Sequence, residues 1–238
     1  INYCKTNALA VVNMLEAIRL TDKSIKFYQA STSELFGSSP APQNENTTFK
    51  PNSPYATAKL YAHWIVNNYR DSFGMFACSG ILMNHESQIR GQEFLTQKVV
   101  KSVVEIMRGN LDYLEIGNMY AQRDWGYAGD FVEAMWLMLQ QDKPDNYVIA
   151  TGETHTVKEF ITECFNRFGV NIKWQGEGLN EIGLDGDKII VKVNPQFYRP
   201  NEVNVLQGDY TKAKNILGWH PKVYFNELIE IMLKDSVK

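Results

Sequence analysis

Two short apolar runs, each ending in a polar cluster, constrain the fold of this chain more than any other feature. Residues 26–30 (KFYQA) lead into residues 31–34 (STSE), and residues 76–83 (FACSGILM) lead into residues 84–87 (NHES). Nearly uniform apolar runs are typical of strands that are buried on both faces of a parallel sheet. Ligands bind such sheets beyond the carboxyl ends of the strands. We therefore expect both polar clusters to lie at one ligand-binding edge.

Helical patterns alternate with these runs. Apolar residues recur at helical spacing over residues 7–19. Ser53 and Pro54 are a helix start signal, with serine as the cap and proline at the first helical position, and Gly74 is expected to end that helix. The sequence also predicts helices over 96–108, 130–140, 157–168 and 225–233, strands over 114–116 and 147–150, and a surface loop over 176–187. This alternation predicts an α/β fold with a doubly wound parallel sheet.

Composition narrows the class of partner. The 238 residues carry a formal net charge of −3, which gives no electrostatic reason to expect nucleic acid or an anionic membrane. No apolar run approaches the ~20 residues of a membrane span. Cys4, Cys78 and Cys164 lack metal-ligand spacing, and we expect buried free thiols and no metal site. We predict a cytoplasmic protein that acts on a small molecule.

Tyr55 and Lys59 are four residues apart in the helix that Ser53 starts, so they share one face. An ammonium group beside a phenol favours the phenolate and lowers a pKa that is about 10 in water. The pair therefore predicts a base that works near neutral pH. The alternative is an ordinary surface pair, because a tyrosine and a lysine at this spacing are a weak pattern alone. Thr32 and Glu34 likewise have simpler alternatives, a strand-end cap and a solvated carboxylate.

A wider resemblance supports the chemical interpretation. The stretches that carry it run from the first polar cluster almost to the end of the chain: ASTSELFG, SPYATAKLYAHWIVNNYRDSFGMFACSGILMNHES, GNMYAQRDWGYAGDFVEAMWLMLQ and FYRPNEVNVLQGDYTKAKNILGW. They resemble the GDP-mannose 4,6-dehydratases, a family of the extended short-chain dehydrogenase/reductases. NHES and RDWG are the most specific parts, because related sugar-nucleotide enzymes usually have Tyr-Gly-Pro after that asparagine.

The resemblance implies a Rossmann-like sheet with a smaller, interleaved α/β substrate domain. The cofactor domain would include residues 1–85 and about 118–150, and the substrate domain about 86–117 and 151–238. The glycine-rich turn of a dinucleotide site does not occur after a strand in this sequence. We therefore expect the N-terminal half of the sheet, on the order of a hundred residues, to precede Ile1.

The resemblance also implies an NADP-dependent hydro-lyase acting on GDP-mannose. A hydride passes from C4 of the mannose to NADP+, water is lost across C5–C6, and the hydride returns to C6. Tyr55 would take the proton of the 4-hydroxyl group while Thr32 hydrogen-bonds the C4 oxygen. Glu34 would remove the C5 proton and assist loss of the C6 hydroxyl group. Lys59 would bind the nicotinamide ribose and tune Tyr55.

Further binding residues follow from the same resemblance. With Tyr55 and Lys59, His85 and Arg90 are expected to contact the cofactor. The expected substrate contacts are Ser33, Asn84, Lys98, Arg123, Arg199 and Glu202. The arginines suit diphosphate oxygens through paired donors, although Arg199 has the alternative of stacking on its aromatic neighbours.

Several alternatives stay open. Ser33 argues against the dTDP-glucose 4,6-dehydratases, which have aspartate there, but not against UDP-glucuronate decarboxylases. Epimerases usually lack the carboxylate of Glu34. A non-catalytic fragment or subunit is the alternative from another class. The family further implies a homodimer or homotetramer, with residues 86–92 at a possible interface.

Overall fold

Parallel pairing of the two predicted strands forms the centre of the first lobe. The computed structural model describes residues 2–198 and 202–236, and it pairs β1 (Phe27–Ala30) with β2 (Ala77–Leu82) and β2 with β7 (Asn146–Ile149), all parallel. Within the described chain these strands form a sheet of order β1-β2-β7. Both polar clusters follow strands of this sheet at the same edge, as the sequence predicted.

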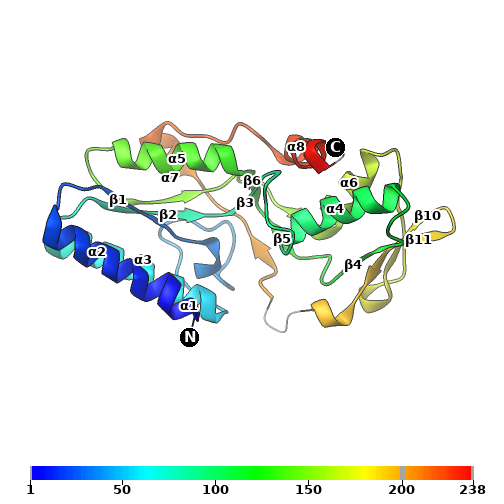
Figure 1. Cartoon of the computed structure of the whole chain (residues 1–238), viewed down its shortest axis with the longest axis horizontal. Coiled ribbons are helices and arrows are strands. Elements are labelled where there is room, and N and C mark those ends of the chain that lie inside the picture. Colours follow the sequence, from blue (N-terminus) through cyan, green and yellow to red (C-terminus); the bar gives the residue numbers. More distant parts are fainter. Residues whose placement is uncertain (1, 199–201, 237–238) are drawn as a thin grey trace.

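Helices cover both faces of this sheet. Helices α2 (Ala10–Thr21) and α3 (Pro54–Phe73) pack on one face, and α5 (Ala128–Gln140) and α7 (Thr211–Leu217) lie on the other (Figure 1). α2 follows a short helical start, α1 (Asn2–Cys4) and a π-helical turn over Lys5–Leu9. The predicted α/β class with a parallel sheet is confirmed. α7 was not predicted from the sequence.

The start of α3 follows the sequence signal. The Ser53 hydroxyl accepts a hydrogen bond from the Ala56 amide at 3.0 Å, and Pro54 occupies the first turn. The helix ends at Gly74, whose φ of 64° is the left-handed conformation that glycine adopts without strain. Because α3 carries Tyr55 and Lys59 in its first two turns, this cap also places the candidate catalytic pair.

A second lobe is built on a sheet of order β4-β11-β10-β9 (Figure 1). Its strands are β4 (Leu114–Ile116), β9 (Lys173–Gln175), β10 (Ile182–Asp185) and β11 (Lys188–Val193). The helices α4 (Leu95–Met107), α6 (Val157–Asn166) and α8 (Phe225–Ser236) supply much of its apolar core.

The loop predicted over residues 176–187 is partly wrong. After a short 3₁₀ turn (Gly178–Asn180), β10 pairs antiparallel with β11 across a turn at Gly186, where φ is +59°. Gly183 lies so close to neighbouring side chains that an added Cβ would be 3.0 Å from Ile172 and 3.1 Å from Val191. Glycine here serves close packing, whereas the sequence interpretation took it as a sign of a loop.

Short strands join the two lobes. β3 (Asn84–Glu86) pairs in parallel with β6 (Trp125–Tyr127), and a separate sheet has the order β12-β5-β8. Those strands are β5 (Gln122–Arg123), β8 (His155–Thr156) and β12 (Val205–Leu206). The sequence interpretation did not predict them.

The core clusters bear on the domain boundaries, which stay a prediction. Val203, Leu206 and Trp219 belong to the core cluster of the first lobe, with β2 and β7, although they follow residue 151. Trp125 belongs to the core of the second lobe. The chain therefore passes between the lobes more often than the predicted ranges state.

The described residues were compared with the predictions about membranes, metals and cysteines. None of their helices combines the length and the apolarity needed to cross a membrane, and no cluster of potential metal ligands occurs among them. Cys78 and Cys164 are buried as expected, but Cys4 is exposed, so the expectation that all three cysteines are buried is wrong.

We predict that Ser53→Ala lowers the free energy of unfolding by about 1 kcal/mol, because the Ala56 amide loses its capping acceptor. Chemical denaturation measures this change. Ser72→Ala is the control, an exposed serine in the last turn of the same helix, and it is expected to change stability by less than about 0.5 kcal/mol. Equal effects of the two substitutions would contradict the capping role.

Candidate active site

The first polar cluster forms a short 3₁₀ turn directly after β1. Thr32 has extended backbone and caps the turn Ser33–Leu35, and its hydroxyl accepts a hydrogen bond from the Glu34 amide at 3.3 Å. Ser33 is buried, whereas Glu34 is partly exposed. The capping role that sequence reasoning held as the alternative for Thr32 is therefore present. It leaves the hydroxyl hydrogen free to donate elsewhere.

Tyr55 and Lys59 approach this turn from α3. The Lys59 ammonium donates to the Ala30 carbonyl at 3.0 Å, at the last residue of β1. Its Nζ lies 5.8 Å from the centroid of the Tyr55 ring. Tyr55 hydrogen-bonds the Thr32 side chain and lies within electrostatic range of Glu34, and both interactions affect its pKa. The structure thus brings the four predicted catalytic residues together at one strand end.

The predicted lowering of the Tyr55 pKa is wrong. Burial raises the pKa of Tyr55, and the Glu34 carboxylate adds to the rise. The hydrogen bond from Thr32 and the charge of Arg90 act in the opposite direction. Lys59 directs its ammonium group to a backbone carbonyl, and burial lowers its own pKa. Arg90 is the cation that favours the phenolate.

The second polar cluster positions His85. Its Nδ1 lies 2.9 Å from the Met83 carbonyl, which can only accept, so Nδ1 carries the hydrogen and Nε2 is an acceptor. The ring stacks on Phe131 with a centroid distance of 5.1 Å. Burial lowers the pKa of His85, and the charge of Arg90 lowers it further. Asn84 is half-buried in the same strand, opposite Trp125.

Glu86 anchors Arg90, and the sequence interpretation missed it. The Glu86 carboxylate is buried, accepts a hydrogen bond from the Thr96 hydroxyl at 2.6 Å, and lies 3.2 Å from Arg90 Nε. The Arg90 guanidinium stacks on the Phe94 ring at 3.7 Å. The sequence did contain a signal for this ion pair, because Glu86 of the NHES motif precedes Arg90 by four residues.

The predicted substrate contacts lie on other elements. Lys98 of α4 donates to the Glu115 carbonyl at 2.8 Å and lies 4.0 Å from the Phe197 ring centroid. Arg123 Nη1 donates to the Val203 carbonyl at 2.8 Å, and its Nη2 lies 3.7 Å from Glu202. The structure therefore brings Arg123 and Glu202 together. Arg199 lies outside the described residues.

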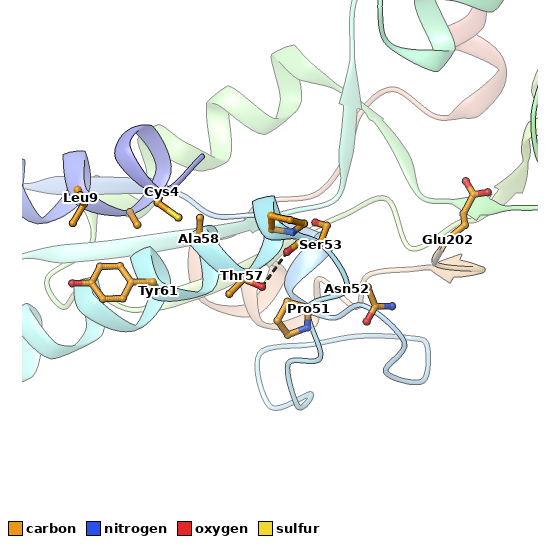
Figure 2. A pocket seen from close by; sticks show the side chains of 11 residues that line it. Cys4, Leu9, Pro51, Asn52, Ser53, Thr57, Ala58, Tyr61 and Glu202 are labelled. Carbon is orange, nitrogen blue, oxygen red and sulfur yellow. Dashed lines mark hydrogen bonds between the residues drawn. The ribbon is translucent and has the colours of Figure 1, made fainter. Parts of the chain in front are cut away.

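A cleft of about 1220 Å³ opens beside the start of α3 (Figure 2). Its lining combines the N-terminal helical turns, the start of α3 and one acid: Cys4, Ala8, Leu9, Pro51, Asn52, Ser53, Pro54, Thr57, Ala58, Tyr61 and Glu202. At 100° per residue, Thr57 and Tyr61 face away from Tyr55 and Lys59. The cleft therefore lies on the other side of α3 from Tyr55 and Lys59, and it is not lined by the four predicted catalytic residues.

Comparison with known proteins agrees with this geometry. The profile of a family described as GDP-mannose 4,6 dehydratase matches residues 1–232. The chain belongs to the GDP-mannose 4,6-dehydratase family. It is 49% identical over 239 residues to the GDP-mannose 4,6 dehydratase of Drosophila melanogaster, with 98% of this chain and 60% of the relative covered.

Other family members give the same result. The human enzyme is 48% identical, with 98% of this chain and 64% of the relative covered. The enzyme of Vibrio cholerae is 46% identical, with 98% and 66% covered. The chain thus spans about two thirds or less of the length of these relatives.

Solved structures support the fold. RMD from Pseudomonas aeruginosa, complexed with NADPH, superposes with a TM-score of 0.83 at 18% identity, covering 98% of this chain and 74% of that chain. A dTDP-glucose 4,6-dehydratase from Bacillus anthracis, in complex with NAD, has a TM-score of 0.79 at 21% identity, covering 97% of this chain and 67% of that one. At these identities the likeness concerns the fold.

His63 lies beneath the first polar cluster and gives a pH-dependent prediction. Its Nδ1 is 3.4 Å from the Ser31 hydroxyl, and burial lowers its pKa from 6.5 to about 4. Because the folded pKa is below the unfolded one, this group stabilises the fold above pH 6.5, and that stability is lost as the pH falls toward 4.

We therefore expect the free energy of unfolding to fall by about 2 kcal/mol from this group between pH 7 and pH 5. Chemical denaturation at both pH values measures it. His63→Gln should reduce the loss by that amount, whereas His220→Gln, at an exposed position, should follow the wild type. A curve for His63→Gln that parallels the wild type would contradict this assignment.

Proposed function

We propose that the protein is a GDP-mannose 4,6-dehydratase, which converts GDP-mannose to GDP-4-keto-6-deoxy-mannose. The observation that carries the proposal is the juxtaposition of Thr32, Glu34 and Tyr55 at the end of β1. A half-buried phenol, a hydroxyl group and a carboxylate at one point are the groups that a coupled oxidation and elimination requires. Relatives that bear this enzyme's name support the choice of substrate.

The residues present suit a nicotinamide cofactor, which we propose to be NADP. Tyr55, Lys59, His85 and Arg90 would hold it, and they offer phenol, ammonium, imidazole and guanidinium donors. Arg90 Nε is buried and lacks a hydrogen bond of good geometry to the described residues, despite its ion pair with Glu86. When bound, such a cofactor would supply the hydride transfer from C4 and its return to C6.

Tyr55 and Thr32 handle the proton at C4. Tyr55 would take the proton of the 4-hydroxyl group, so its phenolate must form in a half-buried place that disfavours charge. The Thr32 hydrogen bond and the Arg90 charge both favour that phenolate. Thr32 would also hydrogen-bond the C4 oxygen, and this contact would hold the 4-hydroxyl group close to the Tyr55 oxygen that takes its proton.

Glu34 would act in the elimination step. Once C4 is a ketone, the C5 proton is acidic because the neighbouring carbonyl stabilises the carbanion. The partly exposed Glu34 carboxylate would remove this proton and then deliver it to the leaving C6 hydroxyl group. General acid–base assistance of this kind contributes roughly 10²–10⁴-fold in rate.

The proposed function has a direct assay. Full-length protein incubated with GDP-mannose and NADP+ is expected to form a 4-keto-6-deoxy sugar nucleotide, detected by mass spectrometry, and NAD+ is expected to support less product. Turnover of UDP-glucuronate instead would favour a decarboxylase of the same fold. If no sugar nucleotide in a panel reacts, the protein is a non-catalytic subunit, and the proposal fails.

We predict that Glu34→Gln stops elimination but spares oxidation. Product formation should fall by roughly 10²–10⁴-fold, while the absorbance of reduced cofactor at 340 nm should still appear in a single turnover. Glu230→Gln is the control, since this glutamate is 64% exposed on α8 and forms an ion pair with Arg167. Normal turnover by Glu34→Gln would remove Glu34 from the mechanism.

We also propose the wider properties that the family resemblance implies. These are a cytoplasmic location, a homodimer or homotetramer, and a division into cofactor and substrate domains. The core contacts support assigning the segment from Val203 to Trp219 to the cofactor domain.

A further inference from the structure

Asp124 of the RDWG motif is buried without a role in the proposed chemistry. Its side chain is fully buried, and its carboxylate accepts four hydrogen bonds from the described chain. Oδ1 accepts from the Thr151 amide at 2.8 Å and the Thr151 hydroxyl at 2.7 Å. Oδ2 accepts from the amides of Gly152 at 3.0 Å and Gly208 at 3.2 Å. All four acceptor positions of the carboxylate are therefore used.

The donors come from two segments that are distant in sequence. Thr151 and Gly152 follow β7, whereas Gly208 follows β12. The segments lie so close together that a Cβ on Gly208 would be 2.3 Å from the Ala150 Cβ. A single carboxylate thus joins the end of the parallel sheet to the chain that returns from the second lobe.

Residues 122–124 also contact the chain that returns from the second lobe, residues 202–208. The Gln122 amide donates to the Asn204 carbonyl at 2.7 Å, and the Asp124 amide donates to the Leu206 carbonyl at 3.0 Å. Arg123 reaches the Val203 carbonyl and pairs with Glu202. Residues 122–124 therefore hold residues 202–208 along their whole length, and Asp124 holds the end nearest the sheet.

We propose that Asp124 is a positioning residue for sugar-nucleotide binding, because its carboxylate fixes the segment 202–208 that presents Glu202 beside Arg123. This inference rests on the proposed function for the identity of the ligand. The catalytic residues lie on the turn after β1 and on α3, which Asp124 does not hydrogen-bond within the described chain. Loss of the carboxylate should therefore weaken substrate binding more than it slows the chemical steps.

A second buried aspartate provides a matched control. Asp130 of α5 accepts hydrogen bonds from the amides of Lys222 at 2.8 Å and Val223 at 2.9 Å, and its side chain is also buried. It joins α5 to the segment before α8, and neither of these donors belongs to the segment 202–208. Asp130→Asn damages a comparable structural clamp without touching the segment 202–208.

The test compares Asp124→Asn with Asp130→Asn in the full-length protein. An amide keeps one acceptor oxygen and turns N–H groups toward donors, so at least one pair of hydrogen bonds is lost. For Asp124→Asn we expect KM for GDP-mannose to rise on the order of tenfold while kcat changes by less than about threefold. Asp130→Asn should leave KM unchanged. Equal KM values for the two variants, or a fall in kcat alone, would overturn the proposal.

Two further measurements cover other outcomes. If Asp124→Asn does not fold, Thr151→Val removes only one of the hydrogen bonds and should raise KM by about threefold; an unchanged KM would overturn the proposal. If wild-type protein forms no 4-keto sugar, the proposed function fails, and hydrogen exchange still tests the positioning role. Peptides that cover 202–208 should then exchange faster in Asp124→Asn than in Asp130→Asn, and equal rates would overturn it.

Discussion

The parallel pairing of β1 with β2 is the constraint on which the rest of the site depends. Ala30 lies opposite Gly80, so both strands end at the same edge, and a polar cluster follows each of them there. An added Cβ on Gly80 would be 2.6 Å from the Tyr28 hydroxyl, and this close fit leaves little room for another residue at that point of the sheet. Once the strands pair, the backbone fixes the end of each strand at one edge, and α3 needs only to bring Tyr55 and Lys59 across the same edge.

The electrostatics of this edge depend on partners from separate elements. Partial burial of the Tyr55 phenol disfavours its charged form, and the nearby Glu34 carboxylate disfavours it further. Arg90 acts against both, but Arg90 is itself held by the buried carboxylate of Glu86 and by the Phe94 ring. The acidity of Tyr55 therefore depends on the loop after β3 as well as on α3. This arrangement links the second polar cluster to the reactivity of the first.

Local signals predicted the parts of the fold that local physics controls. The Ser53 cap, the left-handed Gly74 and the apolar runs of β1 and β2 were each evident in the sequence, because a few neighbouring residues determine them. Strands of two or three residues, such as β5 and β12, were not predicted, because so short a run has no usable periodicity. Their pairing comes from hydrogen bonds to segments far away in the chain. The strand β10 was missed for a different reason, because its glycine indicates a loop until Val191 is known to lie against it.

By itself the sequence determined the α/β class and the polar edge, and its family resemblance predicted that Thr32, Glu34, Tyr55 and Lys59 act together there. Periodicity and capping place such residues on known faces of strands and helices. Only the tertiary structure decided which cation acts on Tyr55, because Lys59 bonds the Ala30 carbonyl while Arg90 arrives from another element. Only the structure showed that Asp124 joins Thr151 to Gly208. Charges act through space and buried acceptors need donors from any segment, so neither can be inferred from distance along the chain.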